Sequence, residues 1–444
     1  MRKRGKCMAW ILLSLLCLLL GGCSFKSGDE LYLLPQPPMD FLNLQMALNA
    51  ILEEGAEYAA PVSGSNRQSV QLVDLDADGE KEAVAFFRVQ DEHPMRLCIF
   101  QKEGGEYRLR TSIEGSGTAI NSVEYINIDS RPGLEIIASW QVSSSVQQYM
   151  GVYSVENWMV TELMSASCDE YCTVDLDSDG QREIFLLKAD TEGRTGVAQL
   201  YRYDGSQLEK EPDVAMSVNT DGLRRMVTGY LEPGVMAVFV ASTYEQSGIV
   251  TDVFVLQNGL FYNASVSPDG SGLSAQTVRN YFIYADDIDS DGLLELPMTV
   301  QLPPRGDNAD SFWVIRWYNL LLNGTQEQKL LTFHNYAAGW YLELPESWSS
   351  EICIYRTEGN AGWIYTIARW NGEDEEPTPM VHISPVSGSV RRLGGGWSVL
   401  GTVSDVTYAV LTTPESDEWS EGLSVEELIA RFHTIRYDWN TNEA

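Results

Sequence analysis

The sequence predicts a mainly β protein made of repeats: a β-propeller of about five four-stranded units, followed by a small α+β module. The first observation is a nine-residue acidic box, D-x-D-x-D-G-x-x-E, which occurs three times in 444 residues. The second is that strand-like apolar runs lead into and out of each box. The carboxylates of the boxes are Asp74, Asp76, Asp78 and Glu82 in the first, Asp175, Asp177, Asp179 and Glu183 in the second, and Asp287, Asp289, Asp291 and Glu295 in the third.

The boxes belong to a longer repeat. With Asp74, Asn127, Asp175, Gly229 and Asp287 as equivalent positions, the spacings are 53, 48, 54 and 58 residues. This is about the length of one four-stranded antiparallel blade, and a chain this long exceeds what one hydrophobic core usually supports. The alternative is a β-sandwich with acidic turns by chance, and three full boxes at near-regular spacing argue against it.

The N-terminal segment has the features of a targeting signal. Four basic residues within positions 2–6 precede an apolar run over 8–20, which is shorter than the ~20 residues that span a bilayer. Small residues directly before Cys23 resemble the lipobox of bacterial lipoproteins. The resemblance implies a signal peptide over 1–22, a Cys23 acylated with palmitate-type chains, and an extracytoplasmic protein anchored to the cell membrane. The alternative is an ordinary secretory signal with an incidental cysteine.

The segment after the signal is expected to be a tether, because residues 23–38 are polar and then rich in proline. Loss of residues 1–22 removes four of the 30 Lys and Arg and none of the 63 Asp and Glu, so the net charge is 26 − 63 = −37. Such a surface repels phosphate backbones, which excludes nucleic acid as a partner. Cys168 and Cys172 are close enough in sequence for a local disulfide or are two core thiols, and the four histidines show no zinc spacing.

The domain from 39 to 335 is predicted to open with a short helix and to continue in strand units. Asp40 is the expected N-cap, apolar residues share one helix face, and Gly55 is the expected stop. The expected strands and hairpins, in chain order, are 71–75 and 83–87 with an outer hairpin over 95–113; 123–129 and 135–140; 172–175 and 184–187; 225–240 with a turn at 232–234; and 281–284, 312–322 and 329–333 with a turn at 323–324.

Residues 336–444 are predicted to form a separate α+β module. Strands are expected at 339–345, where a proline ends the strand, at 352–356, at 362–370 and at 399–412, the last broken at Gly401. Ser424 and Glu427 form a capping box at the start of a helix. The phrase at 339–348, GWYLELPESW, resembles weakly the entry to PsbP-like domains.

Four carboxylates around a glycine indicate a hard cation held by oxygen ligands. A helix–loop–helix calcium site starts with the same residues, but it needs a bidentate Glu at position twelve and helices on both sides. Position twelve is Ala85, Leu186 or Met298 here, the flanks are strands, and the fourth acid stands at position nine. The helical calcium site is therefore excluded.

The box resembles the loop of FG-GAP/VCBS repeats in integrin-type β-propellers, which joins the first two strands of a blade. The resemblance implies that the three aspartates and the ninth-position glutamate of each box supply side-chain oxygens to calcium. It also implies a backbone carbonyl from position seven, which is Glu80, Gln181 or Leu293. The family usually has aspartate at position nine, so the longer glutamate is a departure. Up to three structural calcium ions are expected, and metal-free acidic turns are the alternative.

Two units lack the complete box. In the second unit Asn127, Asp129 and Glu135 remain, but Arg131 and Pro132 replace the third aspartate and the glycine. Because arginine can pair with the acids that a metal would neutralise, we predict no calcium there. The fourth unit has lost the acids.

The composition favours binding over catalysis. There is no G-x-S-x-G elbow, no phosphate-binding glycine loop and no H-E-x-x-H motif. Paired carboxylates are uninformative among 63 acids. Twelve Trp and 21 Tyr could form a sugar-stacking platform, although at strand spacing most are expected in the core. The function predicted is a binding module for an envelope protein or glycan; the alternative is an envelope hydrolase with its site on the propeller face or in the C-terminal module.

Overall fold

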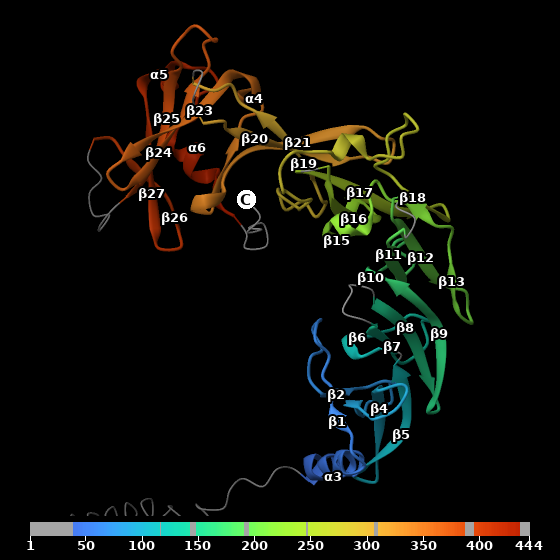
Figure 1. Cartoon of the computed structure of the whole chain (residues 1–444). Helices are drawn as coiled ribbons and strands as arrows, with labels where there is room; N and C mark the ends of the chain where they lie inside the picture. Colours follow the sequence, from blue (N-terminus) through green and yellow to red (C-terminus); the bar gives the residue numbers. More distant parts are fainter. Residues whose placement is uncertain are drawn as a thin grey trace, which may run out of the picture.

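The computed structural model describes residues 39–115, 117–142, 148–190, 195–245, 247–305, 310–386 and 395–435. These residues form six antiparallel β-sheets that follow one another along the chain. Figure 1 shows the sheets in a curved row, with the N-terminal helix at one end and the sixth sheet at the other. The predicted signal (1–22), Cys23 and the tether (23–38) lie outside the described residues, so these predictions stay untested.

The first sheet packs against the predicted N-terminal helix, α3, whose Leu44 and Leu48 lie buried on it. Strand β3 is the central strand, and β1, β2 and β4 all pair with it. The bounds are α3 Met39–Glu53, β1 Glu57–Tyr58, β2 Val70–Val73, β3 Glu82–Arg88, β4 Met95–Glu103 and β5 Glu106–Gly115.

The second, third and fourth sheets each contain a four-strand meander, as the repeat predicts. The second consists of β6 Ala119–Ile126, β7 Glu135–Gln141, β8 Gln148–Glu156 and β9 Met159–Cys168. The third consists of β10 Glu170–Val174, β11 Glu183–Lys188, β12 Val197–Tyr203, β13 Leu208–Lys210 and the short β14 Val214–Ala215. The fourth follows the 3₁₀ turn η1 Thr220–Gly222 and consists of β15 Leu223–Glu232, β16 Val235–Tyr244, β17 Gly248–Gln257 and β18 Leu260–Asn263.

The fifth sheet crosses the boundary predicted between residues 335 and 336. After η2 Ala275–Thr277 it contains β19 Leu296–Gln301, β20 Trp313–Leu320, β21 Gln326–Asn335, β22 Trp340–Leu344 and β28 Phe432–Thr434, with η3 Tyr336–Ala338 between β21 and β22. Strand β22 pairs with β21 along its whole length. The PsbP-like phrase at 339–348 thus supplies the fourth strand of this sheet. The strand expected at 281–284 is wrong, because that segment contains no regular strand.

The region after 345 supplies a sixth sheet with short helices beside it. Its elements are α4 Trp348–Glu351, β23 Ile352–Gly359, β24 Gly362–Arg369, β25 Thr378–Val386, β26 Ser398–Val403, β27 Val406–Thr412, α5 Pro414–Glu418 and α6 Val425–Ala430. The capping box at Ser424 is confirmed, since its hydroxyl accepts from the Glu427 amide while the Glu427 carboxylate accepts from the Ser424 amide. The expected break at Gly401 is wrong: Gly401 lies at a bulge, and the chain turns after Val403.

Five of the hydrophobic cores lie between consecutive sheets. Separate buried clusters join sheets one and two, two and three, three and four, four and five, and five and six. Strand β3 shows the reason, because six of its seven residues are buried and it therefore needs apolar neighbours on both faces. Each sheet is stabilised mainly by the next one, as in other repeat folds.

The mainly β prediction and the antiparallel four-stranded units are confirmed. The sixth sheet comes from the C-terminal region, so the described residues contain one sheet more than the five units predicted. No strand pairing among the described residues links the sixth sheet to the first, so closure into a propeller stays a prediction. Among these residues no helix has the length and apolar character needed to cross a membrane. The cysteines among the described residues, Cys98, Cys168, Cys172 and Cys353, are free thiols.

Candidate metal loops and an aromatic cleft

The three acidic boxes form loops of one conformation. The loops of the first and third sheets join β2 to β3 and β10 to β11, and the loop of the fifth sheet leads into β19. The fourth residue of each loop has a left-handed backbone, with φ of 60°, 60° and 64° at Ala77, Ser178 and Ser290. The sixth residue, glycine, also has positive φ, near 90° in all three loops. L-residues with side chains rarely adopt this conformation, which explains the glycine of the box.

The loop backbone is held by its own carboxylates. In the first loop Asp74 Oδ2 accepts from the Gly79 amide at 3.1 Å, and Asp76 Oδ1 accepts from the Asp78 amide at 3.2 Å. The ninth-position glutamate turns back to the second residue, since Glu82 Oε2 accepts from the Leu75 amide at 2.9 Å. The other two loops repeat all three bonds. One carboxylate oxygen of the glutamate thus closes the loop by accepting this hydrogen bond.

Most of the predicted ligands converge. In the first and third loops the three aspartates each bring one oxygen within 4.8 Å of the others. In the second loop the converging set is Asp175, Asp177 and Glu183 instead. Among the described residues these are the groups of three or more acids, histidines or cysteines that could hold a metal ion. Three of the four predicted ligands in each loop therefore meet at one point.

The first and third loops fit a hard cation. Asp74 Oδ1, Asp287 Oδ1 and Glu295 Oε1 are buried oxygens with no hydrogen-bond partner among the described residues. Burial raises the pKa of Glu82 and of Glu295 to about 7, and the neighbouring aspartates add to the shift. A divalent cation would supply both the missing partner and the missing positive charge. These loops would hold calcium through the aspartates of each box, and the ion would supply structural cross-linking.

The second loop already contains a cation from its own chain. Arg202, on β12, places Nη2 at 2.6 Å from Asp177 Oδ2 and Nε at 3.9 Å from Glu183 Oε1. In the third loop the contact is weaker and more peripheral, since Lys329 Nζ lies 3.3 Å from Asp291 Oδ2. In the second loop calcium would therefore compete with Arg202 for the carboxylates. The first loop has no Lys or Arg within ion-pair distance among the described residues.

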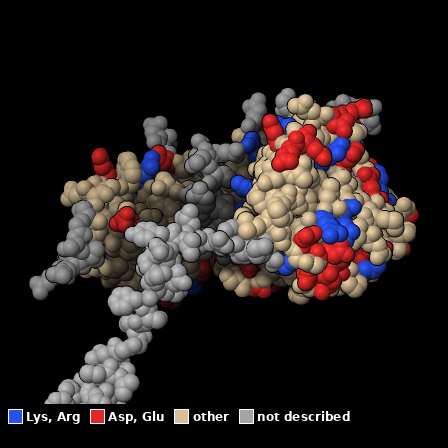
Figure 2. Space-filling model, turned by 90° about the horizontal axis from the view of Figure 1, so that it is seen from below, with Lys and Arg blue, Asp and Glu red and all other residues tan. Residues whose placement is uncertain are grey.

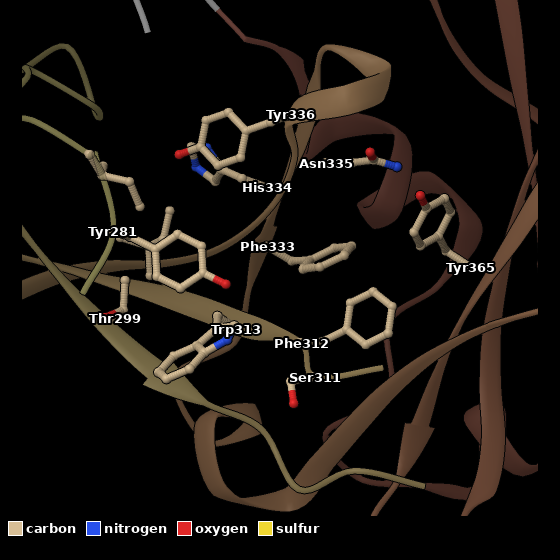
Figure 3. A pocket seen from close by; sticks show the side chains of 12 residues that line it. Tyr281, Thr299, Ser311, Phe312, Trp313, Phe333, His334, Asn335, Tyr336 and Tyr365 are labelled. Carbon is tan, nitrogen blue, oxygen red and sulfur yellow. The ribbon is translucent and has the colours of Figure 1, made fainter. Parts of the chain in front are cut away.

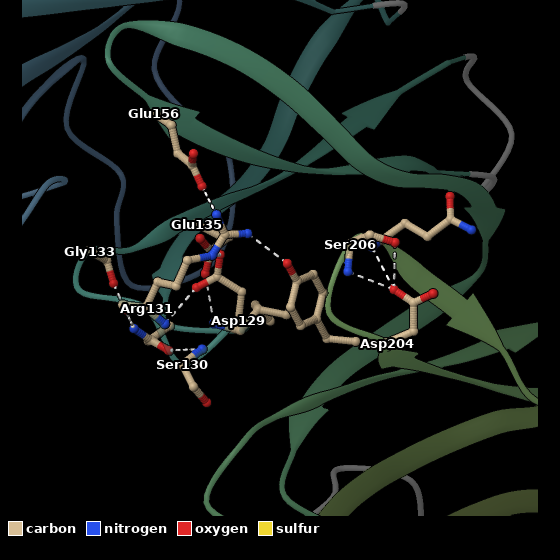
Figure 4. A network of polar contacts seen from close by, with 12 residues as sticks. Asp129, Ser130, Arg131, Gly133, Glu135, Glu156, Asp204 and Ser206 are labelled. Atoms are coloured by element: carbon tan, nitrogen blue, oxygen red, sulfur yellow. Dashed lines mark hydrogen bonds and ion pairs between the residues drawn. The ribbon is translucent and has the colours of Figure 1, made fainter.

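The loop of the second sheet, residues 127–135, is held together by its own side chains (Figure 4). Arg131 Nε lies 2.8 Å from Asp129 Oδ2, which confirms the predicted internal pairing. The same guanidinium contacts Glu156 and donates to the Tyr203 hydroxyl at 2.6 Å. Glu135 keeps its place, because Oε2 accepts from the Ile128 amide at 2.7 Å.

Asn127 supplies donors at the first position of this loop. Its Nδ2 donates to the Gly133 carbonyl at 2.9 Å and also to the Arg131 carbonyl. Gly133 stands at position seven, whose carbonyl the family resemblance assigns to calcium in a complete box. An amide N–H and a guanidinium thus occupy the roles that a cation would have in the other loops.

The structure adds a site that was not predicted, an aromatic cleft of about 210 Å³ where the fifth sheet meets the sixth (Figure 3). Figure 3 shows Tyr281 and Trp313 on one side of the space, Phe312 and Tyr365 on the other, and Phe333 between them. The described lining consists of Tyr281, Ile283, Thr299, Ser311, Phe312, Trp313, Ile315, Phe333, His334, Asn335, Tyr336 and Tyr365.

The cleft offers aromatic faces and a few polar groups without a formal charge. The Tyr281 and Trp313 rings lie 5.3 Å apart at 59°, and Tyr281 is 36% exposed. Burial lowers the pKa of His334 to about 3, so this imidazole is neutral. Asn335 is 5% exposed and its Nδ2 has no hydrogen-bond partner among the described residues, while its Oδ1 accepts from the Ala338 amide. The lining of the cleft thus contains one buried amide donor that is unpaired among the described residues.

Part of this site had a signal in the sequence. Residues 311–313 precede one strand of the predicted hairpin and 333–336 follow the other, so a turn at 323–324 brings the two aromatic groups to the same end. Tyr281 and Tyr365 come from an irregular segment and from another sheet. Their approach depends on tertiary packing that no local pattern reveals.

No known protein family matches the chain, and no curated protein sequence matches it. Solved structures with a weak likeness include the exotype rhamnogalacturonan lyase YesX, 12% identical over 71% of this chain and 69% of that one, with a TM-score of 0.30. Another is an exo-β-1,3-galactanase from Phanerochaete chrysosporium with galactose, 10% identical over 80% of this chain and 91% of that one, with a TM-score of 0.26. A third is Sqt1 from Chaetomium thermophilum, 12% identical over 78% of this chain and 96% of that one, with a TM-score of 0.29. At these TM-scores the likenesses carry no argument about function.

Proposed function

We propose that this chain is a lipid-anchored protein of the cell envelope that binds a neutral glycan in the aromatic cleft, on a repeat scaffold stabilised by calcium. The observation that carries the glycan is the combination of the tilted Tyr281 and Trp313 rings with the buried Asn335 amide. Flat aromatic rings bind the apolar faces of pyranose rings, and a buried unpaired donor gains a full hydrogen bond from a sugar hydroxyl. A protein partner is the other ligand class predicted, and the small concave shape of the cleft favours the sugar.

The charge distribution favours a neutral sugar. None of the described lining residues is charged, because His334 is held neutral. The whole chain carries a net charge of −33, which repels an anionic glycan at long range. A hydroxyl-rich neutral saccharide avoids both the missing counter-charge and this repulsion.

The cleft supports binding better than hydrolysis. Glycoside hydrolysis by two carboxylates needs both acids at the bond that is cleaved. The described lining contains no Asp or Glu. The alternative function, an envelope hydrolase, would require a site elsewhere on the chain.

The sheets are proposed to be FG-GAP/VCBS-like repeats of a propeller, with Cys23 as the lipid anchor. Three loops of one conformation at the start of blade-like units support the repeat assignment. The lipobox-like sequence before Cys23 supports the anchor.

Glycan binding is tested with the full chain on an array of neutral and acidic glycans, followed by calorimetry on the glycans retained. Trp313→Ala and Tyr281→Ala should each weaken binding by about tenfold, equivalent to about 1.4 kcal/mol. Tyr230→Ala is the matched control, because Tyr230 is 40% exposed on β15 and lies outside the cleft. Equal affinity in all three variants would overturn the cleft as the binding site.

A further inference from the structure

Helix α3 has two apolar sides, of which only one is covered by the protein. Leu44 and Leu48 are buried against the first sheet. Asn43 Nδ2 donates to the Gly105 carbonyl in the β4–β5 turn at 2.5 Å, which fixes the rotation of the helix on that sheet. The helix is therefore docked in one orientation, and its opposite side faces outward.

The outward side is apolar. Phe41 is 57% exposed, Leu42 is 39% exposed and Met46 is 63% exposed. Between these side chains the helix places Gln45 and Asn49, which bond to each other through Gln45 Nε2 and Asn49 Oδ1 at 2.9 Å. With 3.6 residues per turn, these five positions form one continuous face.

This face carries no charge before the C-terminal end of the helix, where the exposed Glu53 continues it. Residues 41–52 contain no Asp, Glu, Lys or Arg, in a chain where these make up 21% of residues. Figure 2 looks onto the end of the molecule at which α3 lies, and it shows an uncharged area between groups of acidic and basic side chains. Large exposed apolar side chains gathered in an uncharged area mark a contact surface.

The chain before α3 indicates what covers this surface. The predicted tether starts at Cys23 and ends where α3 begins, at Met39, so 39 − 23 = 16 residues separate the lipid anchor from the helix. Sixteen residues span at most about 55 Å. The anchor therefore keeps the helix within reach of the bilayer surface.

We propose that the side of α3 formed by Phe41, Leu42 and Met46 lies in the interface of the bilayer that carries the Cys23 anchor. This inference rests on the anchor of the proposed function. An exposed apolar helix face and an acyl anchor are two membrane signals that act together. The contact fixes the first sheet at the membrane and points the other end of the row, with the aromatic cleft, away from it (Figure 1).

The proposal predicts the lipid requirement. The helix has no basic residue, so contact should depend on apolar burial and not on anionic headgroups. Phosphatidylcholine vesicles and vesicles with added phosphatidylglycerol should therefore give the same depth of insertion. A deeper position only in the anionic vesicles would overturn the proposal.

Site-directed spin labelling of the lipidated full chain tests the contact. In Met46→Cys the nitroxide should become accessible to oxygen and protected from a water-soluble nickel complex when the protein is in phosphatidylcholine vesicles. In Leu260→Cys, the matched control at a residue 68% exposed on β18, nickel accessibility should not change. Native Cys98, Cys168 and Cys353 are buried, and the half-buried Cys172 is replaced by alanine in both labelled proteins, so labelling favours the introduced thiol.

Three results would overturn the proposal, and they are distinguishable. If the protein floats with vesicles while the label at 46 stays nickel-accessible, the anchor is correct and the helix contact is wrong. If the protein does not float with the vesicles, the lipid anchor is absent, and the contact of α3 with the bilayer is absent as well. If labels at 46 on two molecules broaden each other, a second copy covers the face instead of lipid. Glycan binding is measured separately and is independent of all three.

Discussion

The loops at 74–82 and at 127–135 have the same length and the same closing glutamate, but the negative charge of their aspartates is compensated differently. Both hold their ninth-position carboxylate on the amide of the second residue. In 127–135 the remaining acid, Asp129, is paired with Arg131, and Asn127 donates to the position-seven carbonyl. In 74–82 three aspartates converge and Asp74 Oδ1 is buried without a partner among the described residues.

The difference shows what a cation contributes to such a loop. A charge and several donors are needed at the centre, and the protein can supply them from side chains or leave them to an ion. Arg202 makes the loop at 175–183 intermediate, with a complete acidic box and a guanidinium already in place. The four loops thus form a graded series, from a loop without an internal cation at 74–82 to one whose acid is paired internally at 127–135.

Removal of calcium should produce the largest effect. With free calcium at one hundred times the dissociation constant, each occupied loop adds about 2.7 kcal/mol, so the first and third loops together add about 5 kcal/mol. Chelation should therefore lower the melting temperature of the full chain in calorimetry, and added calcium should restore it. An unchanged melting temperature would mean that the acidic loops close without an ion.

Acid should destabilise the protein by a route that does not involve the loops. The pKa of His334 is about 3 in the folded state because the imidazole is buried, and about 6.5 when unfolded. When burial lowers the pKa of a base in the folded state, the protein has its full stability from this group above pH 6.5. This part of the free energy of unfolding is lost as the pH falls toward 3, because the unfolded state binds the proton more tightly. At pH 4 the loss is about 3 kcal/mol.

His334→Phe keeps a ring against Tyr341, whose centroid lies 4.9 Å from that of His334, and removes the titration. Chelated wild-type protein should therefore lose more stability between pH 6.5 and pH 4 than the chelated variant. The comparison in chelator separates this core effect from calcium. Equal pH dependence of unfolding in both proteins would show that His334 is not the titrating group.

The third loop should affect the cleft, whereas the first should not. Ile288 in the third loop packs in one buried cluster with Ile283, and Ile283 lines the cleft beside Tyr281. Asp287→Asn with Asp289→Asn should loosen this segment and weaken glycan binding by about tenfold, equivalent to about 1.4 kcal/mol. Asp74→Asn with Asp76→Asn is the matched control in another sheet. Equal loss of glycan affinity in both double variants would break the assignment of distinct roles.

Replacement of Arg131 or Arg202 should give the smallest changes in stability. The two replacements should differ in whether the change depends on calcium. Arg131 and Arg202 are partly exposed, so each pair contributes about 1 kcal/mol. Arg202→Gln should lower stability in chelator and increase the stabilisation that calcium provides, because it frees Asp177. Arg131→Gln should lower stability equally with and without calcium. A calcium-dependent gain in Arg131→Gln, seen by thermal melting, would contradict the role given to Asn127.

The sequence revealed the features that depend on neighbouring residues. The acidic loops are contiguous, so their ligands and the pairing of Arg131 with Asp129 follow from nine residues. The pairing of Arg202 with Asp177 could not be predicted, because the two residues are 25 positions apart and the register of β11 and β12 brings them together. The segment 281–284 looked like a strand because it is aromatic and apolar, but Ile283 packs into a core and Tyr281 into the cleft.

The sixth sheet shows the same limit at the level of the fold. Its strands β23 and β24 were predicted, whereas β25, with two prolines within Thr378–Val386, was not. Strand β22 was assigned to the C-terminal module, but hydrogen bonding to β21 places it in the fifth sheet. Pairing across a predicted boundary is decided by tertiary contacts, which a local pattern does not contain.

The most direct test is a crystal structure of the calcium-saturated protein with ions identified by anomalous scattering. The graded series predicts calcium bound by the aspartates of 74–82 and 287–295, weaker occupancy at 175–183 beside a displaced Arg202, and none at 127–135. Calcium within 127–135, or its absence from both 74–82 and 287–295, would contradict the claim that an ion replaces what Arg131 and Asn127 supply.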